Sequence, residues 1–163
     1  MTRLGLLAGA ALLVAACAGQ REPEVLTISE VRVDTDLSAI GSAEAMGYWQ
    51  NLSADLETAI AAEFAAQIDP AGKRILVDVD ELTLANALTA GLTPQDATLA
   101  GRVTLENPNG TTAAAYDVTA TSNDVRSYLP PGTTRVSPTS TEYYQAIVRA
   151  FARGTATTLN AGS

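Results

Sequence analysis

The strongest constraint on the fold is a tight turn placed between two alternating segments. Residues 107–110 read Asn-Pro-Asn-Gly, a cluster of turn-forming residues. The flanking segments 98–106 and 112–121 carry apolar side chains on alternate positions, namely Leu99, Val103 and Leu105 before the turn and Ala114, Tyr116, Val118 and Ala120 after it. Because alternate residues of a strand share one face, this pattern predicts an antiparallel β-hairpin with one apolar face.

Two further strands and a helix are predicted before the hairpin. Residues 25–36 and 74–85 alternate as strands, and in each the apolar phase changes sides partway, near Ser29-Glu30 and Asp80-Glu81. Such a change predicts a β-bulge or a change of covering layer. Between them, residues 42–67 carry apolar side chains three or four positions apart, which is typical of one helix face, at Ala45, Trp49, Leu52, Leu56, Ile60 and Phe64. Residues 86–97 are ambiguous, with room for one helical turn.

The C-terminal part is predicted to be a long loop followed by a helix. Residues 122–138 are rich in Pro, Gly, Ser and Thr and show no helical or strand period. Thr139 and Glu142 have the spacing of a capping box, which marks a helix start. The apolar face of that helix is expected to comprise Tyr144, Ile147, Val148, Phe151 and Leu159. Residues 160–163 are expected to form a loose tail.

The resulting element order is β-α-β-β-β-α, within a single α+β domain of residues 25–160. A strand–helix–strand unit favours parallel pairing, and the hairpin adds two antiparallel strands, so the sheet should be mixed. Each helix has one apolar face to bury. Both are therefore expected on one face of the sheet, giving a two-layer sandwich.

The first residues have the pattern of an export signal. Arg3 is followed by an unbroken run of Leu, Gly, Ala and Val from Leu4 to Ala16, which is shorter than the about 20 residues that span a bilayer as a helix. The run ends in Val14-Ala15-Ala16-Cys17, and polar residues follow soon after it. This ending resembles the lipobox of bacterial lipoproteins, with Val14 where leucine is commoner. The resemblance implies a signal peptide of residues 1–16 and diacylglyceryl and acyl groups on Cys17; the alternative is an ordinary signal peptide with an incidental cysteine.

A lipidated Cys17 would anchor the domain close to a membrane. Residues 17–24 would form the lipidated N-terminus and a polar linker, which reaches roughly 20–25 Å at about 3.3 Å per extended residue. The lipoprotein resemblance implies a location in the cell envelope facing the periplasm. Ala18, in place of an aspartate after the lipidated cysteine, implies sorting to the outer membrane.

Composition excludes several function classes. The chain has 163 residues, of which 10 are Lys or Arg and 18 are Asp or Glu, giving a net charge of −8. No run of basic residues is present, so we expect no nucleic-acid partner. There is no histidine, which removes the commonest general base and zinc ligand and any Ser-His-Asp triad. No glycine-rich phosphate loop occurs, and we expect no cofactor and no enzymatic activity.

Acidic residues near the ends of two strands are the remaining candidates for chemistry. If the strands 25–36 and 74–85 pair, several carboxylates converge on one patch: Asp34, Asp36, Asp78, Asp80 and Glu81. Carboxylate clusters suit Ca²⁺, and a carboxylate pair suits acid/base catalysis. No EF-hand spacing is present, and a solvated sheet face explains the same pattern, so we predict neither a metal site nor a catalytic residue. Lys73, a possible partner for a serine dyad, is expected to be a solvated turn residue.

The function favoured by these observations is binding or positioning a protein partner near the membrane, without catalysis. The element order is loosely similar to that of small envelope lipoproteins such as the auxiliary lipoproteins of ABC transporters, which implies such a role. Within the loop 122–138, the apolar residues Val125, Tyr128 and Leu129 are the candidate contacts, although Tyr128 and Leu129 could instead cover the edge of the core. The alternative function is a carrier of a small apolar or lipid-like ligand between helices and sheet.

Overall fold

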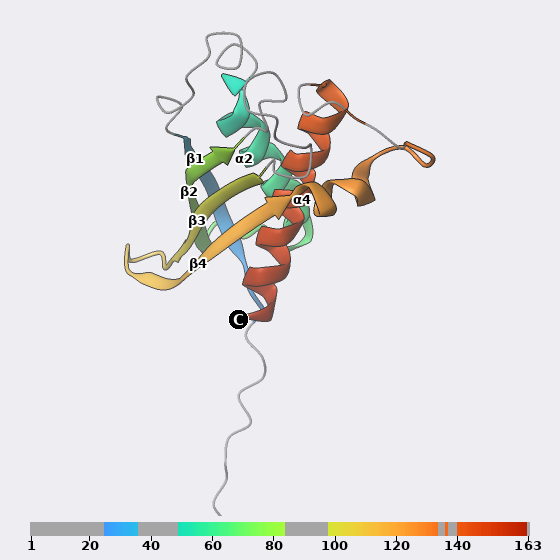
Figure 1. The fold of residues 1–163 in the computed structure, drawn as a ribbon. Helices are drawn as coiled ribbons and strands as arrows, with labels where there is room; N and C mark the ends of the chain where they lie inside the picture. Colours follow the sequence, from blue (N-terminus) through green and yellow to red (C-terminus); the bar gives the residue numbers. More distant parts are fainter. Residues whose placement is uncertain (1–24, 36–48, 84–97, 134–135, 137–139, 163) are drawn as a thin grey trace, which may run out of the picture.

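A computed structural model describes residues 25–35, 49–83, 98–133, 136 and 140–162 (Figure 1). The backbone of residues 80–83 is described without their side chains. The elements follow the order β1 (Ile28–Thr35), α2 (Leu52–Glu63), the 3-10 turn η2 (Ala65–Gln67), β2 (Lys73–Thr83), β3 (Thr98–Glu106), β4 (Thr112–Thr121), α3 (Ser122–Val125), the 3-10 turn η4 (Arg126–Tyr128) and α4 (Thr141–Ala161). The predicted helical turn in residues 86–97 lies outside the described residues.

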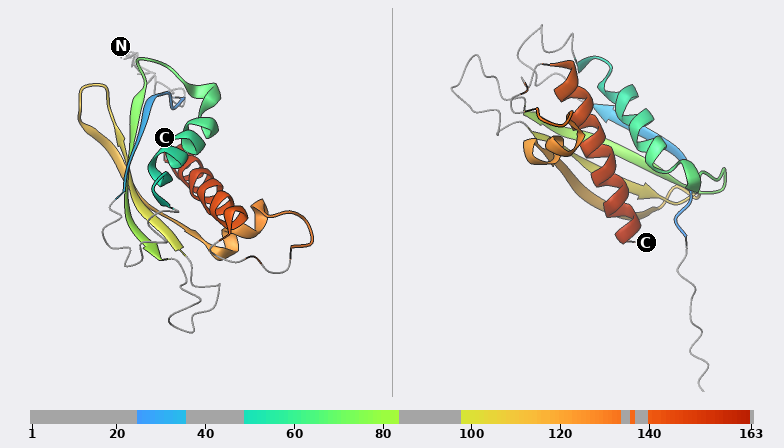
Figure 2. Two further views of the ribbon diagram at one scale, coloured as in Figure 1. Left: turned by 90° about the horizontal axis from the view of Figure 1, so that it is seen from above. Right: turned by 90° about the vertical axis from the view of Figure 1, so that its right-hand side faces the viewer.

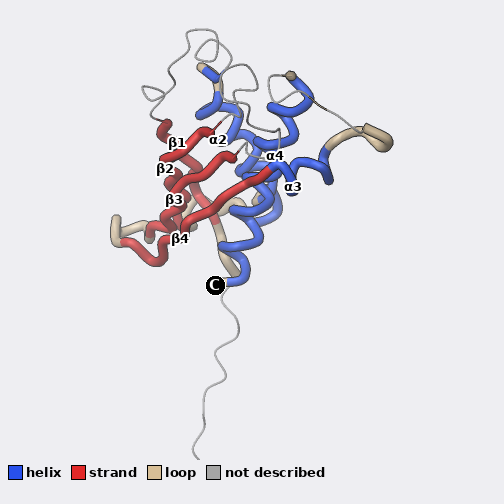
Figure 3. The backbone as a smooth tube through the Cα atoms, viewed as in Figure 1, coloured by secondary structure: helices blue, strands red, loops and turns tan. Residues whose placement is uncertain are grey.

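The four strands form one mixed sheet in the order β1-β2-β3-β4, as Figure 3 shows. β1 and β2 are parallel, whereas β2, β3 and β4 are antiparallel neighbours. The predicted hairpin is confirmed with its boundaries at residues 98–106 and 112–121, and Gly110 in its turn has a positive φ of 82°. A residue without Cβ adopts this conformation at no steric cost.

Both long helices cover the same face of the sheet, which confirms the two-layer sandwich (Figure 2). α2 packs on β1 and α4 packs on β4 and β3, and the two helices contact each other. Three polar contacts follow the length of this pair: the Tyr144 hydroxyl donates to Asp55, Arg153 Nη1 lies 2.9 Å from Glu63 Oε2, and Gln67 Nε2 donates to Asn160 Oδ1 over 3.1 Å. These pairs advance together along both chains, so α2 and α4 run parallel.

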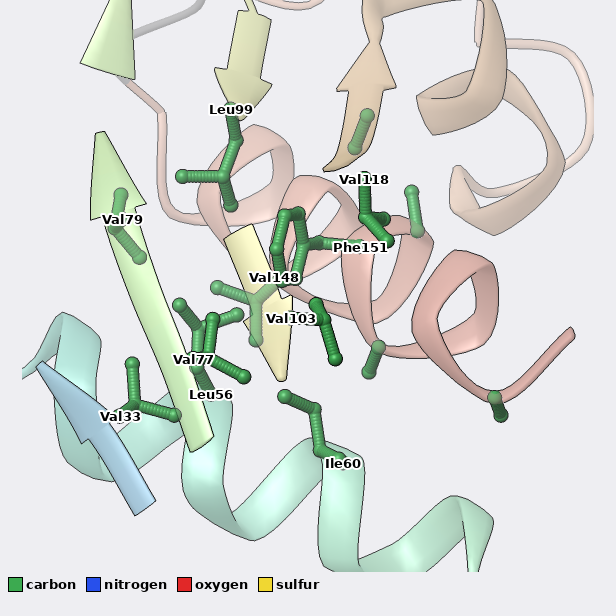
Figure 4. Packing of buried hydrophobic residues seen from close by; sticks show 14 of the residues in the cluster. Val33, Leu56, Ile60, Val77, Val79, Leu99, Val103, Val118, Val148 and Phe151 are labelled. Carbon is green, nitrogen blue, oxygen red and sulfur yellow. The ribbon is translucent and has the colours of Figure 1, made fainter. Parts of the chain in front are cut away.

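Between helices and sheet lies one hydrophobic core, part of which is shown in Figure 4. The predicted inward residues Val77, Val103 and Val118 are at most 5% exposed, and Phe151 of α4 is fully buried among them. The predicted stripe of the first helix is confirmed where it is described, because Trp49, Leu52, Leu56, Ile60 and Phe64 are all buried. The Trp49 ring packs edge-on against Tyr144, with ring centroids 4.9 Å apart.

Irregular strand pairing occurs where the apolar phase changes sides. The β1–β2 register shifts between Ile28 and Glu30, and the β2–β3 register shifts between Asp78 and Glu81. Gly101 lies opposite the second shift, where an added Cβ would come within 2.6 Å of the Asp78 carbonyl oxygen. A bulge or a change of covering layer was predicted at both places, and the register shifts are consistent with the bulge. Gly101 is required by the close approach of the neighbouring backbone.

The last helix differs from its predicted boundaries at both ends. Ser140 is the N-cap, and its hydroxyl accepts a hydrogen bond from the Tyr143 amide over 3.1 Å, so the helix starts one residue later than the predicted cap at Thr139. At the other end the helix continues to Ala161, where a loose tail was expected. The Asn160 side chain donates to the Ala156 carbonyl over 2.9 Å. The Gly162 amide donates to the Thr158 carbonyl over 3.2 Å, which satisfies one of the last carbonyl groups of the helix.

The first helix also departs from its predicted extent. The described helix begins at Leu52, after the turn residues Gln50 and Asn51, and ends at Glu63 before the separate turn η2, where one continuous helix over residues 42–67 was predicted. Residues 42–48 of the prediction lie outside the described residues. Lys73, expected in a turn, is the first residue of β2, and its amide donates to the Thr27 carbonyl over 2.9 Å.

Candidate functional site

The predicted acidic patch is partly assembled on the outer face of the sheet, the face without helices. Asp34 of β1 is the register partner of Asp78 of β2, so the two carboxylates are neighbours. Arg102 of β3 is the register partner of Asp78 on the other side, and Asp117 of β4 is the partner of Arg102. The row therefore alternates toward β4, with a guanidinium between carboxylates. Asp36 lies outside the described residues, and the side chains of Asp80 and Glu81 are not described.

Ion pairing and exposure determine what this row can do. Arg102 Nη2 lies 3.1 Å from Asp117 Oδ1, and the two side chains are 60% and 74% exposed. Among the residues that the structure describes, no group of three or more His, Cys, Asp or Glu side chains could hold a metal ion. An exposed pair of this kind is screened by water and contributes little to stability. The exposure and the pairing of these side chains are those of a solvated sheet face.

The same outer face carries two further ion pairs at its other rows. Arg74 pairs with Glu106 across β2 and β3, and Arg32 Nη2 lies 2.9 Å from Glu30 Oε1 within β1. Apart from the neighbouring carboxylates of Asp34 and Asp78, the charged side chains described on this face lie in pairs of opposite charge. Charged side chains on an open sheet face discourage edge-to-edge association with other chains.

Residues 122–128 are helical, so the prediction of a structureless loop over residues 122–138 was wrong for this part. α3 starts with a capping box, in which the Thr121 amide and hydroxyl donate to Asp124 Oδ2 over 2.8 and 2.7 Å. These hydrogen bonds lower the pKa of Asp124, because they stabilise the carboxylate. The Thr-x-x-Asp spacing at 121–124 was the sequence signal for this helix start.

The three candidate contact residues of this segment have different surroundings. Val125 is only 1% exposed and belongs to the core, so it cannot contact a partner in this structure. Its burial follows from α3, which packs against α4. Tyr128 and Leu129 are half-buried and pack against the core, so they do cover its edge while keeping part of their surface exposed.

Two buried hydroxyl groups have no hydrogen-bond partner within the described part of the chain, those of Tyr143 and Thr155 in α4. Burial raises the pKa of Tyr143, because the phenolate would lose its hydration. Sequence reasoning placed Tyr144 on the apolar face and missed Tyr143, one position away. The two hydroxyls are three turns apart along α4 and therefore do not form one site.

Cys17, the predicted lipidation residue, lies outside the described residues. Within the described ranges, no helix is both long enough and apolar enough to cross a membrane.

Comparison with known proteins gives one structural likeness. No protein-family model and no curated protein matches the chain. The chain is similar to a solved structure described as a minor lipoprotein from Acinetobacter baumannii, with 17% sequence identity and a TM-score of 0.40. The likeness covers 82% of this chain and 94% of that chain. At this TM-score, the likeness carries no statement about function.

Proposed function

We propose that the chain is a lipoprotein of the bacterial cell envelope, anchored by lipid on Cys17. The observation that carries this proposal is the sequence Val14-Ala15-Ala16-Cys17 at the end of an apolar run that begins after Arg3. Two or more acyl chains hold a protein stably, because each buried CH₂ contributes about 0.8 kcal/mol. Ala18 after the cysteine favours the outer membrane, with the domain facing the periplasm.

The anchor is tested by replacing the acceptor thiol. Cys17→Ser removes the only cysteine of the chain, so it should abolish acylation and leave an uncut or soluble form. Detergent phase separation and the mass of the N-terminal peptide measure the two effects. Ala18→Ser is the matched control and should keep both the acyl groups and the membrane partitioning. Membrane partitioning of Cys17→Ser equal to that of the parent chain would contradict the anchor.

We further propose a role without catalysis, in which the domain binds or positions an envelope protein. The segment Arg126–Pro131 is the proposed contact surface, because Tyr128 and Leu129 keep part of their apolar surface exposed. This segment follows the C-terminal end of β4. β1 and β2 are parallel, and β2–β3 and β3–β4 are both antiparallel, so β4 runs in the same direction as β1. The segment after β4 therefore lies at the opposite end of the sheet from the start of β1. A partner could therefore reach it on the side away from the linker.

Crosslinking in cells tests this surface. The double variant Tyr128→Ser with Leu129→Ser should lose its crosslinked partner while the domain stays folded. Since both residues pack against the core, a fall in unfolding free energy of about 0.5–3 kcal/mol is expected. Val125→Ala is the matched control, because it weakens the same segment from inside the core. Loss of the partner in the control, or its persistence in the double variant, would contradict the proposed contact.

The alternative role as an apolar-ligand carrier gains no support from the described part of the chain. A carrier needs an open apolar cavity of about 300 Å³ or more. The large side chains between helices and sheet, among them Phe64, Ile60 and Phe151, are inaccessible to solvent and belong to one cluster.

A further inference from the structure

Two large apolar side chains stay exposed in the described part of the chain, Val25 at 71% and Ile68 at 56%. Single exposed apolar residues are common on protein surfaces and need no explanation. Here their shared position is the informative observation, because they are far apart in sequence.

Backbone contacts bring the segment containing Ile68 against the start of β1. Ile68 forms an isolated parallel bridge with Ile28, and the Asp69 amide donates to the Ile28 carbonyl over 3.0 Å. At Gly72 an added Cβ would lie 2.7 Å from the backbone of Thr27 and Ile28, so the two segments are in close contact. Val25 precedes Thr27 by two residues and therefore lies at this same end of the sheet.

The patch has charged residues beside it in the sequence, namely Glu24 before Val25, Asp69 after Ile68 and Lys73 after Gly72. Pro70 and Ala71 are exposed in the turn that follows Ile68. The Asp69 carboxylate accepts a hydrogen bond from the Ala71 amide over 2.8 Å, which holds this turn. We call Val25, Ile68, Pro70 and Ala71 the anchor-end patch.

With an acylated Cys17, the short chain between Cys17 and Val25 would hold this patch near the bilayer. Residues 18–24 span at most about 25 Å when extended, and they join the domain at Val25 itself. A tether of this length converts a second contact with the same membrane into an intramolecular event, so a weak apolar contact becomes significant. Apolar side chains that reach the headgroup boundary lose contact with water.

We propose that the anchor-end patch rests on the lipid surface that holds Cys17, so that the domain has one orientation on the membrane. This inference rests on the proposed lipid anchor. In that orientation β1 and β2 lead away from the membrane, and Tyr128 and Leu129 lie at the far end of the domain.

The single cysteine makes a direct test possible. When Cys17 is acylated, a cysteine introduced at Ala71 is the only free thiol and accepts the environment-sensitive dye NBD. The full-length acylated protein is reconstituted into protein-free phosphatidylcholine vesicles, and NBD emission and its quenching by aqueous iodide are measured. Ser127→Cys, on the exposed surface of η4, is the matched control position.

The expected result is a blue shift of the dye at residue 71 and loss of iodide quenching, with neither change at residue 127. Ile68→Ser added to the residue-71 probe should restore quenching while leaving acylation and the unfolding midpoint unchanged. An acylated protein whose dye at residue 71 is quenched as fully as the dye at residue 127 would overturn the docking alone. An unacylated Cys17, read from the mass of the same sample, would overturn both the anchor and the docking. Because the vesicles hold no other protein, a dye that is shielded only in cell membranes would assign the patch to a protein partner instead.

Discussion

The two faces of the sheet are made from the same strands but have opposite chemistry. In β2, Ile75, Val77 and Val79 point toward the helices and are buried, whereas Arg74 and Asp78 on the other face take part in charged rows. Alternation along a strand produces this division directly. The stability of the covered face depends on how well its side chains pack, whereas the open face carries charged side chains in contact with water. Carboxylates at outward positions of a sheet covered on one face therefore indicate a solvated surface before they indicate a binding site.

Differences in energy follow from the same division. A buried large side chain is worth several kcal/mol, because its removal leaves a cavity as well as exposing apolar surface. An exposed ion pair is worth about 0–1 kcal/mol. Three substitutions test whether the two faces differ in this way: one in the helix-covered core, one in a contact between α2 and the edge strand β1, and one on the open face of the sheet.

The largest effect is expected inside the helix-covered layer. Trp49→Ala should lower the unfolding free energy by roughly 3–5 kcal/mol, because it empties a site that is 1% exposed and removes the ring contact with Tyr144. Denaturant unfolding measures the change. Unfolding at the same denaturant concentration as the parent protein would show that the Trp49 side chain is not part of the core.

An intermediate effect is expected at the edge formed by β1. The Val33 amide donates to Glu57 Oε1 of α2 over 3.0 Å, so a helix side chain satisfies a backbone donor that β2 does not reach. Glu57→Ala should cost about 1–3 kcal/mol, because this half-buried amide loses its acceptor. Faster hydrogen exchange at Val33 and a lower urea midpoint measure the loss.

Glu57→Gln is the matched control for the edge, since its amide oxygen can still accept the Val33 hydrogen bond. It should remain close to the parent protein in both measurements. Equal losses for Glu57→Ala and Glu57→Gln would mean that the charge, and not the hydrogen bond, stabilises this edge.

The smallest effect is expected on the open face. Arg102→Gln removes the guanidinium between Asp78 and Asp117 and should cost about 0–1 kcal/mol, less at high salt because screening weakens exposed pairs. Urea unfolding at low and high ionic strength measures both effects. A loss above about 2 kcal/mol that persists in high salt would contradict the view of this face as a solvated surface.

Local pattern was sufficient to predict the sheet and the inward face of the first helix. Each strand shows its inward face as alternating apolar residues in the sequence. The hairpin can be predicted from a turn between two such segments. The changes of apolar phase near Ser29 and Asp80 located the bulges, because a bulge reverses the face of every following residue. The same alternation placed Asp34 and Asp78 side by side, but it could not place Arg102 next to them, because that position depends on the register of β3.

The candidate contact segment was predicted less well. Val125 was taken for a loop residue because four residues are too few to show a helical period. The capping box at Thr121 and Asp124 was present in the sequence, and only the docking of α3 on α4 made this short helix stable.

By itself, the sequence determined the element order, the hairpin, the inward residues of the strands and the candidate lipidation at Cys17. Tertiary structure decided how much of α4 is buried. Ala146, Ala150, Ala152 and Ala156 are buried in addition to the predicted apolar stripe, because the sheet, α2 and α3 each contact this helix. The apolar period of a helix sequence identifies the single face that packs against one neighbouring element. A small side chain such as alanine is compatible with either an exposed surface or a close contact. Only the assembled neighbours decide between them.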